Sequence, residues 1–284
     1  MRIGIDLGGT NIAGGVVSPN GELLFKKSIP TKPCRGVDAV IADITALCRS
    51  LAKECGENNV QSIGIGCPGM VHPPDGTITN AANIGFVDIP IADIMGGQLH
   101  LPVYVENDSN CAALAESMFG AARGSKVSVT VTLGTGIGSG IVIGGKIFSG
   151  AFFGAGEVGH HIIHVNGEPC GCGRRGCWET YASATALTRQ SGGMSPKEAF
   201  DTAPKHIVEK YLDNLCIGLA NIIAFLQPDV IVIGGGISGQ GQSLITAIES
   251  RMDVLVIGGK LKTRFAVSQL GNDAGIIGAA CIGT

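Results

Sequence analysis

Residues 5–17 read IDLGGTNIAGGVV, and residues 131–143, much later in the chain, read VTLGTGIGSGIVI. Each stretch runs from an apolar strand through a Leu-Gly turn, with a threonine close by, into a second apolar and glycine-rich strand. Self-similarity within one chain indicates repeated structural units. The sequence therefore predicts two related α/β lobes.

The residues around the two stretches extend this prediction. In the first lobe, strands are expected at residues 2–5, 12–17 and 22–28, followed by a helix over residues 37–55 that ends at Gly56. In the second lobe, apolar patterning predicts three strands within residues 126–148, a long helix over 204–227 and a strand at 229–235. We expect lobe boundaries of 1–108, completed by a C-terminal helix at 272–284, and 109–271.

The composition excludes several classes of protein. Of the 284 residues, 45% are hydrophobic and 15% are charged, which is enough apolar material for a large core and disfavours disorder. The net charge of −3 and the absence of a Lys/Arg run disfavour a nucleic-acid partner. Apolar runs are short, and polar Asp6 comes early. We therefore expect no membrane span, no signal peptide and a cytoplasmic location.

Glycine turns follow the apolar strands where phosphate-binding turns would be built. In DLGGTN, Gly8 and Gly9 let backbone N–H groups approach an anionic oxygen, Thr10 adds a hydroxyl, and Asp6 is placed to hold a cation. LGTGIGSG at residues 133–140 repeats the device. The alternative is a pair of ordinary hairpins. No G-x-x-x-x-G-K-[ST] string is present, so a nucleotide here is not bound by a P-loop.

A third glycine cluster, IVIGGGISGQG, allows a competing interpretation. Gly234, Gly236 and Gly239 satisfy the G-x-G-x-x-G spacing of dinucleotide-binding folds. The cluster falls near the end of the chain, which leaves too little sequence to complete such a fold. A glycine turn that holds an adenosine is therefore favoured over NAD binding.

Asp108 lies in VENDSN, where a strand ends and a helix begins. An aspartate there can cap the helix. The carboxyl end of a strand is also where α/β folds place chemistry, and a carboxylate can accept the proton of a polyol hydroxyl. The sequence leaves both roles open.

The stretch GEPCGCGRRGCWE at residues 167–179 contains the only close cluster of cysteines. His160, Cys170, Cys172 and Cys177 have the composition of a closed Cys₃His zinc site, which would be structural. His161 and His164 are rival ligands that spacing cannot exclude. Unliganded thiols remain an alternative, whereas the odd number of clustered cysteines disfavours disulfides. Such a metal would fix a glycine-rich loop and position the acidic residues on either side of it, Glu157 and Glu179.

Taken together, these motifs resemble the ROK family (repressor, open reading frame, kinase) over essentially the whole chain, and within it the bacterial glucokinases. IDLGGTNIAGGVV and LGTGIGSGIVIGGKI resemble the family's two phosphate motifs, and PDVIVIGGGIS resembles its adenosine motif. VENDSNCAALAE resembles the segment that carries the catalytic aspartate, whereas GIGCPGMV and NAANIGF look like sugar-side segments. GAGEVGHHIIHVNGEPCGCGRRGCWETYAS matches the family's E-x-G-H and C-x-C-G-x-x-G-C-x-E patterns.

The resemblance implies an actin-like, ribonuclease-H-like two-lobe ATPase fold of the α/β class, and a role for individual residues. Asp108 would be the general base. The sugar would be contacted by Asn83, Asn107, Glu157, His160 and Glu179. The phosphates and adenosine of ATP would be lined by Gly8, Gly9, Thr10, Thr135, Gly136, Gly235 and Gly236, with Asp6 near Mg²⁺. Zinc would be held by His160, Cys170, Cys172 and Cys177, so the family pattern favours His160 over its neighbours.

The activity that the resemblance implies is ATP-dependent phosphorylation of a hexose at the 6-hydroxyl, with glucose expected first. N-acetylmannosamine, N-acetylglucosamine, allose, mannose or fructose are alternative substrates, and a non-catalytic sugar-binding regulator is an alternative function. The donor is left open between ATP and polyphosphate. Some family members are repressors with a DNA-binding domain ahead of the kinase-like body, and the early Asp6 disfavours this here. A homodimer is expected only because dimers are common in the family.

Overall fold

The computed structural model describes residues 1–283, and its internal contacts divide the chain into two compact units. Unit 1 comprises Met1–Gly120, Ile147–Ala155 and the C-terminal segment from Asn272, and unit 2 comprises Ala121–Lys146 and Gly156–Gly271. This division differs from the predicted boundary at residue 108, because the helix that follows it and a short later segment both group with unit 1. No helix within residues 1–283 is both long and apolar enough to cross a membrane.

Unit 1 is built on a five-stranded sheet in the order β3-β2-β1-β4-β8. The strands β1, β4 and β8 run parallel, whereas β2 and β3 form antiparallel neighbours at one edge. The bounds are β1 (Arg2–Leu7), β2 (Asn11–Val17), β3 (Leu23–Pro30), β4 (Ile63–Cys67) and β8 (Val103–Asn107). The three strands expected at the start of the chain are confirmed, each shifted by no more than a few residues.

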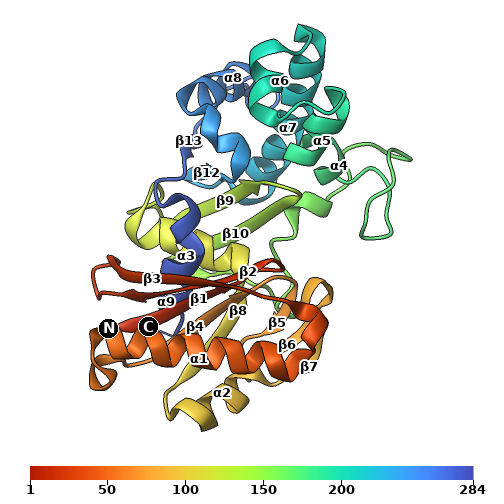
Figure 1. Cartoon of the computed structure of the whole chain (residues 1–284). Helices are drawn as coiled ribbons and strands as arrows, with labels where there is room; N and C mark the ends of the chain where they lie inside the picture. Colours follow the sequence, from red (N-terminus) through yellow and green to blue (C-terminus); the bar gives the residue numbers. More distant parts are fainter. Residues whose placement is uncertain (284) are drawn as a thin grey trace. The chain divides into compact units, whose positions relative to one another are not determined.

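Helices cover both faces of this sheet (Figure 1). On one face, α1 (Val37–Cys55), with the bounds predicted from its apolar spacing, packs its buried Leu47 and Leu51 near Gly14 of β2. On the other face lie α3 (Asp108–Phe119) and the C-terminal α9 (Ala274–Ala280), which contact each other closely. The N-terminal sheet is thus completed by the end of the chain.

Glycines in β1 and β4 set how closely α9 approaches the sheet. A Cβ atom on Gly64 would overlap the carbonyl oxygen of Ala279, and one on Gly4 would overlap that of Ile276. Where α9 contacts α3, a Cβ on Gly278 of α9 would overlap the carbonyl oxygen of Cys111 of α3. Backbone therefore packs against backbone here, and no side chain larger than hydrogen fits at these positions.

A smaller antiparallel sheet in unit 1, of order β5-β6-β7, was not expected from the sequence. Its strands are β5 (Met70–His72), β6 (Thr77–Ala81) and β7 (Phe86–Ile89), followed by α2 (Ile91–Leu99). The strands are short and separated by turns, so no window of the sequence carries a clear strand period.

Unit 2 repeats the plan of unit 1 with a sheet in the order β11-β10-β9-β12-β13. Again an antiparallel hairpin precedes parallel strands, here β9, β12 and β13. The bounds are β9 (Val127–Leu133), β10 (Ile137–Ile143), β11 (Lys146–Ile147), β12 (Val230–Gly234) and β13 (Arg264–Val267). The predicted internal repeat is confirmed at the level of strand order.

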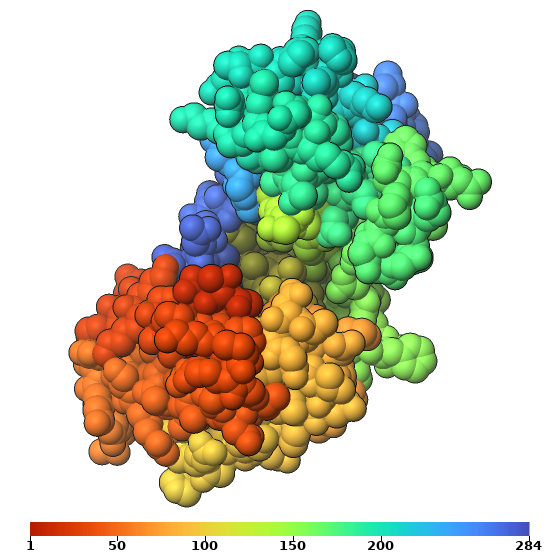
Figure 2. Space-filling model, turned by 45° about the vertical axis from the view of Figure 1, so that its right-hand side comes forward, coloured from red at the N-terminus to blue at the C-terminus, as the bar shows by residue number. Residues whose placement is uncertain are grey.

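The helices of unit 2 gather around the long α7 (Lys205–Leu226), whose predicted bounds are confirmed within one residue. Its buried Gly218 lies against Trp178, so that a Cβ there would overlap the indole ring, and the hydroxyl of its buried Tyr211 donates to the carbonyl of Ala182 at 2.9 Å. The other helices are α4 (Glu179–Ala182), α5 (Ala184–Gln190), α6 (Pro196–Thr202) and α8 (Gln242–Met252). Residues 156–178, the part of the chain between β11 and α4 that belongs to unit 2, form a largely irregular arm at its surface (Figure 2, green).

Replacing Gly64 by alanine tests the close packing of α9. We expect Gly64→Ala to lower the free energy of unfolding by about 2–3 kcal/mol, because the new methyl group must displace backbone. Gly97→Ala in α2 is the matched control, since nothing lies within 4 Å of the Cβ position and alanine favours a helix. Urea unfolding of both variants decides the matter, and equal stabilities would contradict this account.

Candidate functional site

Two aspartates lie at the carboxyl end of the parallel strands of unit 1. Asp6 is near the end of β1, and Asp108 is the first residue of α3, directly after β8. Gly66 of β4 lies between the two strands, paired with Asp6 on one side and Glu106 on the other. A Cβ on Gly66 would be 3.6 Å from the Cα of Asp108. The structure thus brings both predicted acidic residues to the edge where α/β sheets place chemistry.

Asp6 is partly buried, and its environment favours the protonated form. Burial raises the pKa of its carboxyl from 3.8 to about 6, and the negative charge of Asp108 contributes, while Lys26 acts in the opposite direction. Lys26 itself forms an ion pair with Asp273 at 2.5 Å. Without a bound cation, ionised Asp6 is therefore destabilising, and a metal ion or a phosphate-bound cation would relieve this.

The helix-capping role belongs to Asn107 rather than to Asp108. Asn107 Oδ1 accepts hydrogen bonds from the backbone N–H groups of Ser109 at 2.9 Å and Asn110 at 3.2 Å, and its Nδ2 donates to the carbonyl of Gly69 at 3.1 Å. Asp108 Oδ1 accepts from the N–H of Ser109 at 2.7 Å. Because Asn107 caps the helix, the carboxylate of Asp108 is not needed for that role. Asp108 can therefore serve as a proton acceptor.

The first glycine turn connects β1 and β2. Gly8 N–H donates to the carbonyl of Asn11 at 3.0 Å, and the hydroxyl of Thr31 donates to the carbonyl of Gly8 at 2.6 Å. Gly9 and Thr10 are exposed at its tip. Asn83, in the short 3₁₀ turn Ala82–Ile84, lies beside the tip, with its Cβ 3.8 Å from the Cβ position of Gly9. Unit 1 thus brings one predicted sugar residue, Asn83, next to its predicted phosphate turn.

The second glycine turn, in unit 2, connects β9 and β10. Glu179 Oε2 accepts a hydrogen bond from the backbone N–H of Ile137 at 2.9 Å, and a Cβ on Gly136 would collide with this carboxylate. Gly235 has a left-handed φ of 77°, and its Cβ position is 2.6 Å from the carbonyl oxygen of Leu133. The turn with exposed Thr135 and the turn with Gly235 and Gly236 therefore lie side by side.

One histidine and three cysteines converge in the arm of unit 2. The potential ligand atoms of His160, Cys170, Cys172 and Cys177 all lie within 4.8 Å of one another. The sulfurs of Cys172 and Cys177 are 3.6 Å apart, and Nδ1 of His160 is 3.6 Å from the sulfur of Cys170. Two sulfurs bound to one tetrahedral zinc ion at 2.3 Å are separated by about 3.8 Å, so these residues fit zinc.

The rival histidines have other partners. His164 Nε2 is hydrogen-bonded to Oδ1 of Asn214 at 2.8 Å, and the ring of His161 stacks on that of Trp178 at 5.3 Å. Neither belongs to the cluster. Hydrogen bonds from the backbone and side chain of Arg174 lower the pKa of the Cys172 thiol to about 6, which favours the thiolate that binds a metal. Among the described residues, the geometry thus selects His160.

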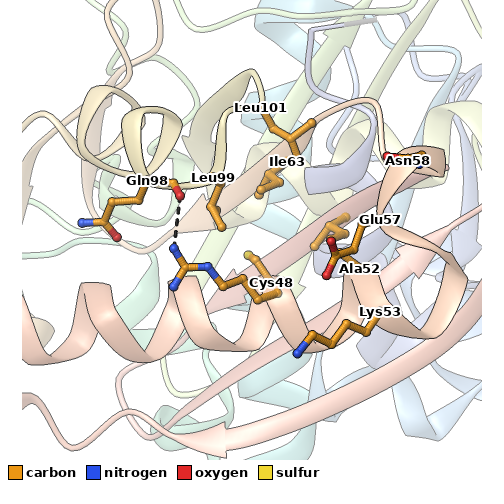
Figure 3. A pocket seen from close by; sticks show the side chains of 11 residues that line it. Cys48, Ala52, Lys53, Glu57, Asn58, Ile63, Gln98, Leu99 and Leu101 are labelled. Atoms are coloured by element: carbon orange, nitrogen blue, oxygen red, sulfur yellow. Dashed lines mark hydrogen bonds between the residues drawn. The ribbon is translucent and has the colours of Figure 1, made fainter.

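A cavity of about 410 Å³ in unit 1 lies away from these residues (Figure 3). Ile3 and Ile63, near the amino ends of β1 and β4, form part of its lining, and Arg49 at its rim donates to the carbonyl of Gln98 at 3.1 Å. None of the predicted site residues lines it. The candidate site is therefore the open carboxyl edge of the strands rather than this cavity.

The family follows from comparison with known proteins. A model of the ROK family matches residues 2–283. The chain belongs to the ROK family. The match to the family and to the solved structure of a ROK glucokinase confirms the predicted α/β fold class, the actin-like two-lobe fold, and each unit holds one of its mixed sheets.

Relatives and solved structures place it among sugar kinases of this family. The glucokinase of Halalkalibacterium halodurans is 35% identical, covering 97% of this chain and 92% of that protein. The N-acetyl-D-glucosamine kinase of Citrobacter koseri is 33% identical, covering 99% and 98%. The crystal structure of a ROK family glucokinase from Streptomyces griseus in complex with glucose and AMPPNP is 32% identical, with a TM-score of 0.84 and coverage of 99% and 98%.

Removing one cysteine of the cluster tests the metal site. We expect Cys172→Ser to lower bound zinc from about one ion per chain to near zero and the melting temperature by about 10 °C, because the arm has little core of its own. Cys34→Ser, which removes another exposed thiol, is the control. Elemental analysis and thermal unfolding provide the readouts. A variant without zinc that melts like the wild type would show that the metal is not structural.

Replacing Asp6 tests the cost of its charge. Because the folded-state pKa is about 6, above the 3.8 of the free group, stability present below pH 3.8 is lost as the pH rises through 6. The loss at pH 8 is at most about 3 kcal/mol. In buffer without Mg²⁺, Asp6→Asn should therefore raise the melting temperature relative to wild type at pH 8 by about 5 °C, and less at pH 5. The exposed Asp93→Asn serves as control, and a gain independent of pH would refute the charge effect.

Proposed function

We propose that this ROK-family protein transfers the γ-phosphoryl group of ATP to the 6-hydroxyl of a hexose, with glucose as the preferred acceptor. The supporting observation is the position of Asp108 at the carboxyl end of β8, with Asn107 capping the helix behind it. The relative from Streptomyces griseus, similar over almost its full length, was solved with glucose and AMPPNP.

In the proposed reaction, Asp108 accepts the proton of the sugar hydroxyl as its oxygen attacks the γ-phosphorus. The bond between this phosphorus and the bridging oxygen breaks, ADP leaves, and the proton remains on Asp108 until it passes to water. The turn with Gly8, Gly9 and Thr10 and the turn with Thr135 and Gly136 supply backbone N–H groups for the phosphates. Gly235 and Gly236 serve the adenosine. Asp6 would help to hold Mg²⁺, which when bound would supply positive charge against the phosphates.

The side chains assigned to the sugar are all polar. They are Asn83, Asn107, Glu157, His160 and Glu179. His160 directs Nδ1 toward the cysteines, so Nε2 is the ring nitrogen assigned to the sugar. Glu179 uses Oε2 for the glycine turn, and its Oε1, which lies 4.0 Å from the sulfur of Cys170, is assigned to a hydroxyl. A site of such groups discriminates strongly against a sugar that lacks a hydroxyl.

A second candidate is a kinase for N-acetylglucosamine. It is favoured by the N-acetyl-D-glucosamine kinase of Citrobacter koseri, which is 33% identical over 99% of this chain. The reaction and the role of Asp108 are the same for both sugars. Only the group at carbon 2 of the sugar distinguishes them, so a comparison of substrates separates the candidates.

The test is ADP release with Mg-ATP across glucose, mannose, allose, fructose, N-acetylglucosamine and N-acetylmannosamine. We expect the highest kcat/KM with glucose and a decrease in kcat of about 10³-fold in Asp108→Asn, because the general base is lost. Asp93→Asn, an exposed aspartate of α2, should retain wild-type activity. Polyphosphate in place of ATP tests the donor. A folded, zinc-loaded protein that phosphorylates no sugar, or an Asp108→Asn variant with full activity, would overturn the proposal.

A further inference from the structure

Glu106 is a buried carboxylate two residues before Asp108. It belongs to β8, and only 5% of its surface is exposed. None of the ion pairs among residues 1–283 includes it. Burial raises the pKa of its carboxyl, and two hydrogen bonds act in the opposite direction. A buried carboxylate without a cation costs free energy, so its presence calls for an explanation beyond packing.

The contacts of Glu106 fix the turn that presents Asp108. Its Oε1 accepts hydrogen bonds from the backbone N–H of Asn107 at 2.8 Å and from Nδ2 of Asn110 at 2.9 Å. These two residues lie on either side of Asp108 along the chain. Asn107 is further held by its bonds to Ser109, Asn110 and Gly69. The position of Asp108 is thus determined by a network whose innermost acceptor is Glu106.

Hydrogen bonding alone does not explain why this residue is charged. A glutamine at position 106 has a carbonyl oxygen that can accept the same two hydrogen bonds without the cost of burying a charge. The negative charge of Glu106 must therefore have an effect beyond these hydrogen bonds, since an amide could make them at a lower cost in free energy.

The groups around Glu106 are predominantly acidic. Burial is the main cause that raises the pKa of the Cys111 thiol in α3, and Glu106, Asp108, Asp6 and Cys281 raise it further. Burial likewise raises the pKa of the Cys67 thiol at the end of β4, and Asp108 and Asp6 add to this. Two cations act on this group: Lys26, which is paired with Asp273, lowers the pKa of Asp6, and Arg2 lowers the pKa of Cys281. Each carboxylate in such a cluster makes its neighbours hold a proton more tightly.

We propose that Glu106 is a positioning residue for Asp108, which holds the turn between β8 and α3 through its hydrogen bonds and strengthens Asp108 as a base through its charge. The proposal rests on the proposed function, in which Asp108 accepts the sugar proton. Glu106 itself is buried behind the turn and takes no part in the transfer. It acts because a nearby negative charge favours the form of Asp108 that has gained a proton.

The first experiment separates the charge from the hydrogen bonds. Glu106→Gln should leave the zinc content and the KM values for sugar and ATP within about twofold of wild type. It should lower kcat about three- to tenfold and move the acid limb of the kcat–pH profile down by about one pH unit. Asn110→Ala, which keeps the charge and removes one hydrogen bond, should lower kcat without that downward movement. Glu116→Gln, at a second buried glutamate of α3, is the control.

The outcomes decide between positioning and simple stability. If Glu106→Gln lowers the melting temperature and kcat while the acid limb stays in place, the charge has only a structural role and the proposal is wrong. If Glu106→Gln does not fold, Asn110→Ala provides the test, because this variant keeps the charge of Glu106. An acid limb that moves down by about one pH unit in Asn110→Ala would refute the proposal.

A second measurement does not depend on turnover. Carboxylate ¹³C NMR titration, with the Asp108 resonance assigned by its loss in Asp108→Asn, should show a lower pKa for Asp108 in Glu106→Gln than in wild type. An unchanged value would overturn the proposal. If the wild type phosphorylates no sugar, the proposed function fails, whereas the titration still shows whether Glu106 acts on Asp108.

Discussion

The contact between the backbone of α9 and the glycines of β1 and β4 is the constraint on which unit 1 depends. Gly4 and Gly64 allow the helix to lie against the strands, and Gly278 allows α3 to approach in turn. The helix comes from the end of the chain, so the N-terminal sheet is completed only when the C-terminal segment is in place. The same contact brings Gly275 within 3.1 Å of the Asp6 carboxylate, measured from its Cβ position. The environment of a predicted site residue thus follows from the packing of the core.

That packing places three carboxylates close to one another at the carboxyl end of the parallel strands. Asp6, Glu106 and Asp108 lie at one end of a sheet whose neighbouring helices contribute mostly apolar groups and thiols. A cluster of this kind weakens the fold at neutral pH, because burial and like charge both oppose ionisation. Natural proteins accept such a loss at functional sites. In the proposed reaction, this negative charge favours proton uptake by Asp108 and would favour a cation beside Asp6.

Much of the architecture could be predicted from the sequence, because the glycine turns and the helix over 37–55 carry strong local signals. The metal cluster was equally predictable, since its residue types are rare and closely spaced. The small sheet β5-β6-β7 was missed because its strands are short, and the grouping of residues 147–155 with unit 1 depends on tertiary contacts alone. Glu106 was missed because only the fold shows that it is buried behind Asp108.

Glu179 is another residue whose structural contacts could not be predicted from its spacing in the sequence. The residue follows the cysteine arm directly, starts α4, and accepts a hydrogen bond from Ile137 at 2.9 Å. Its other carboxylate oxygen lies 4.0 Å from the sulfur of Cys170. The arm holding the metal ligands and the glycine turn of β9–β10 are therefore joined through one side chain. A zinc ion that fixes the arm would fix the turn with it, so a structural metal would set the geometry of the turn that we propose for the phosphates without contacting them.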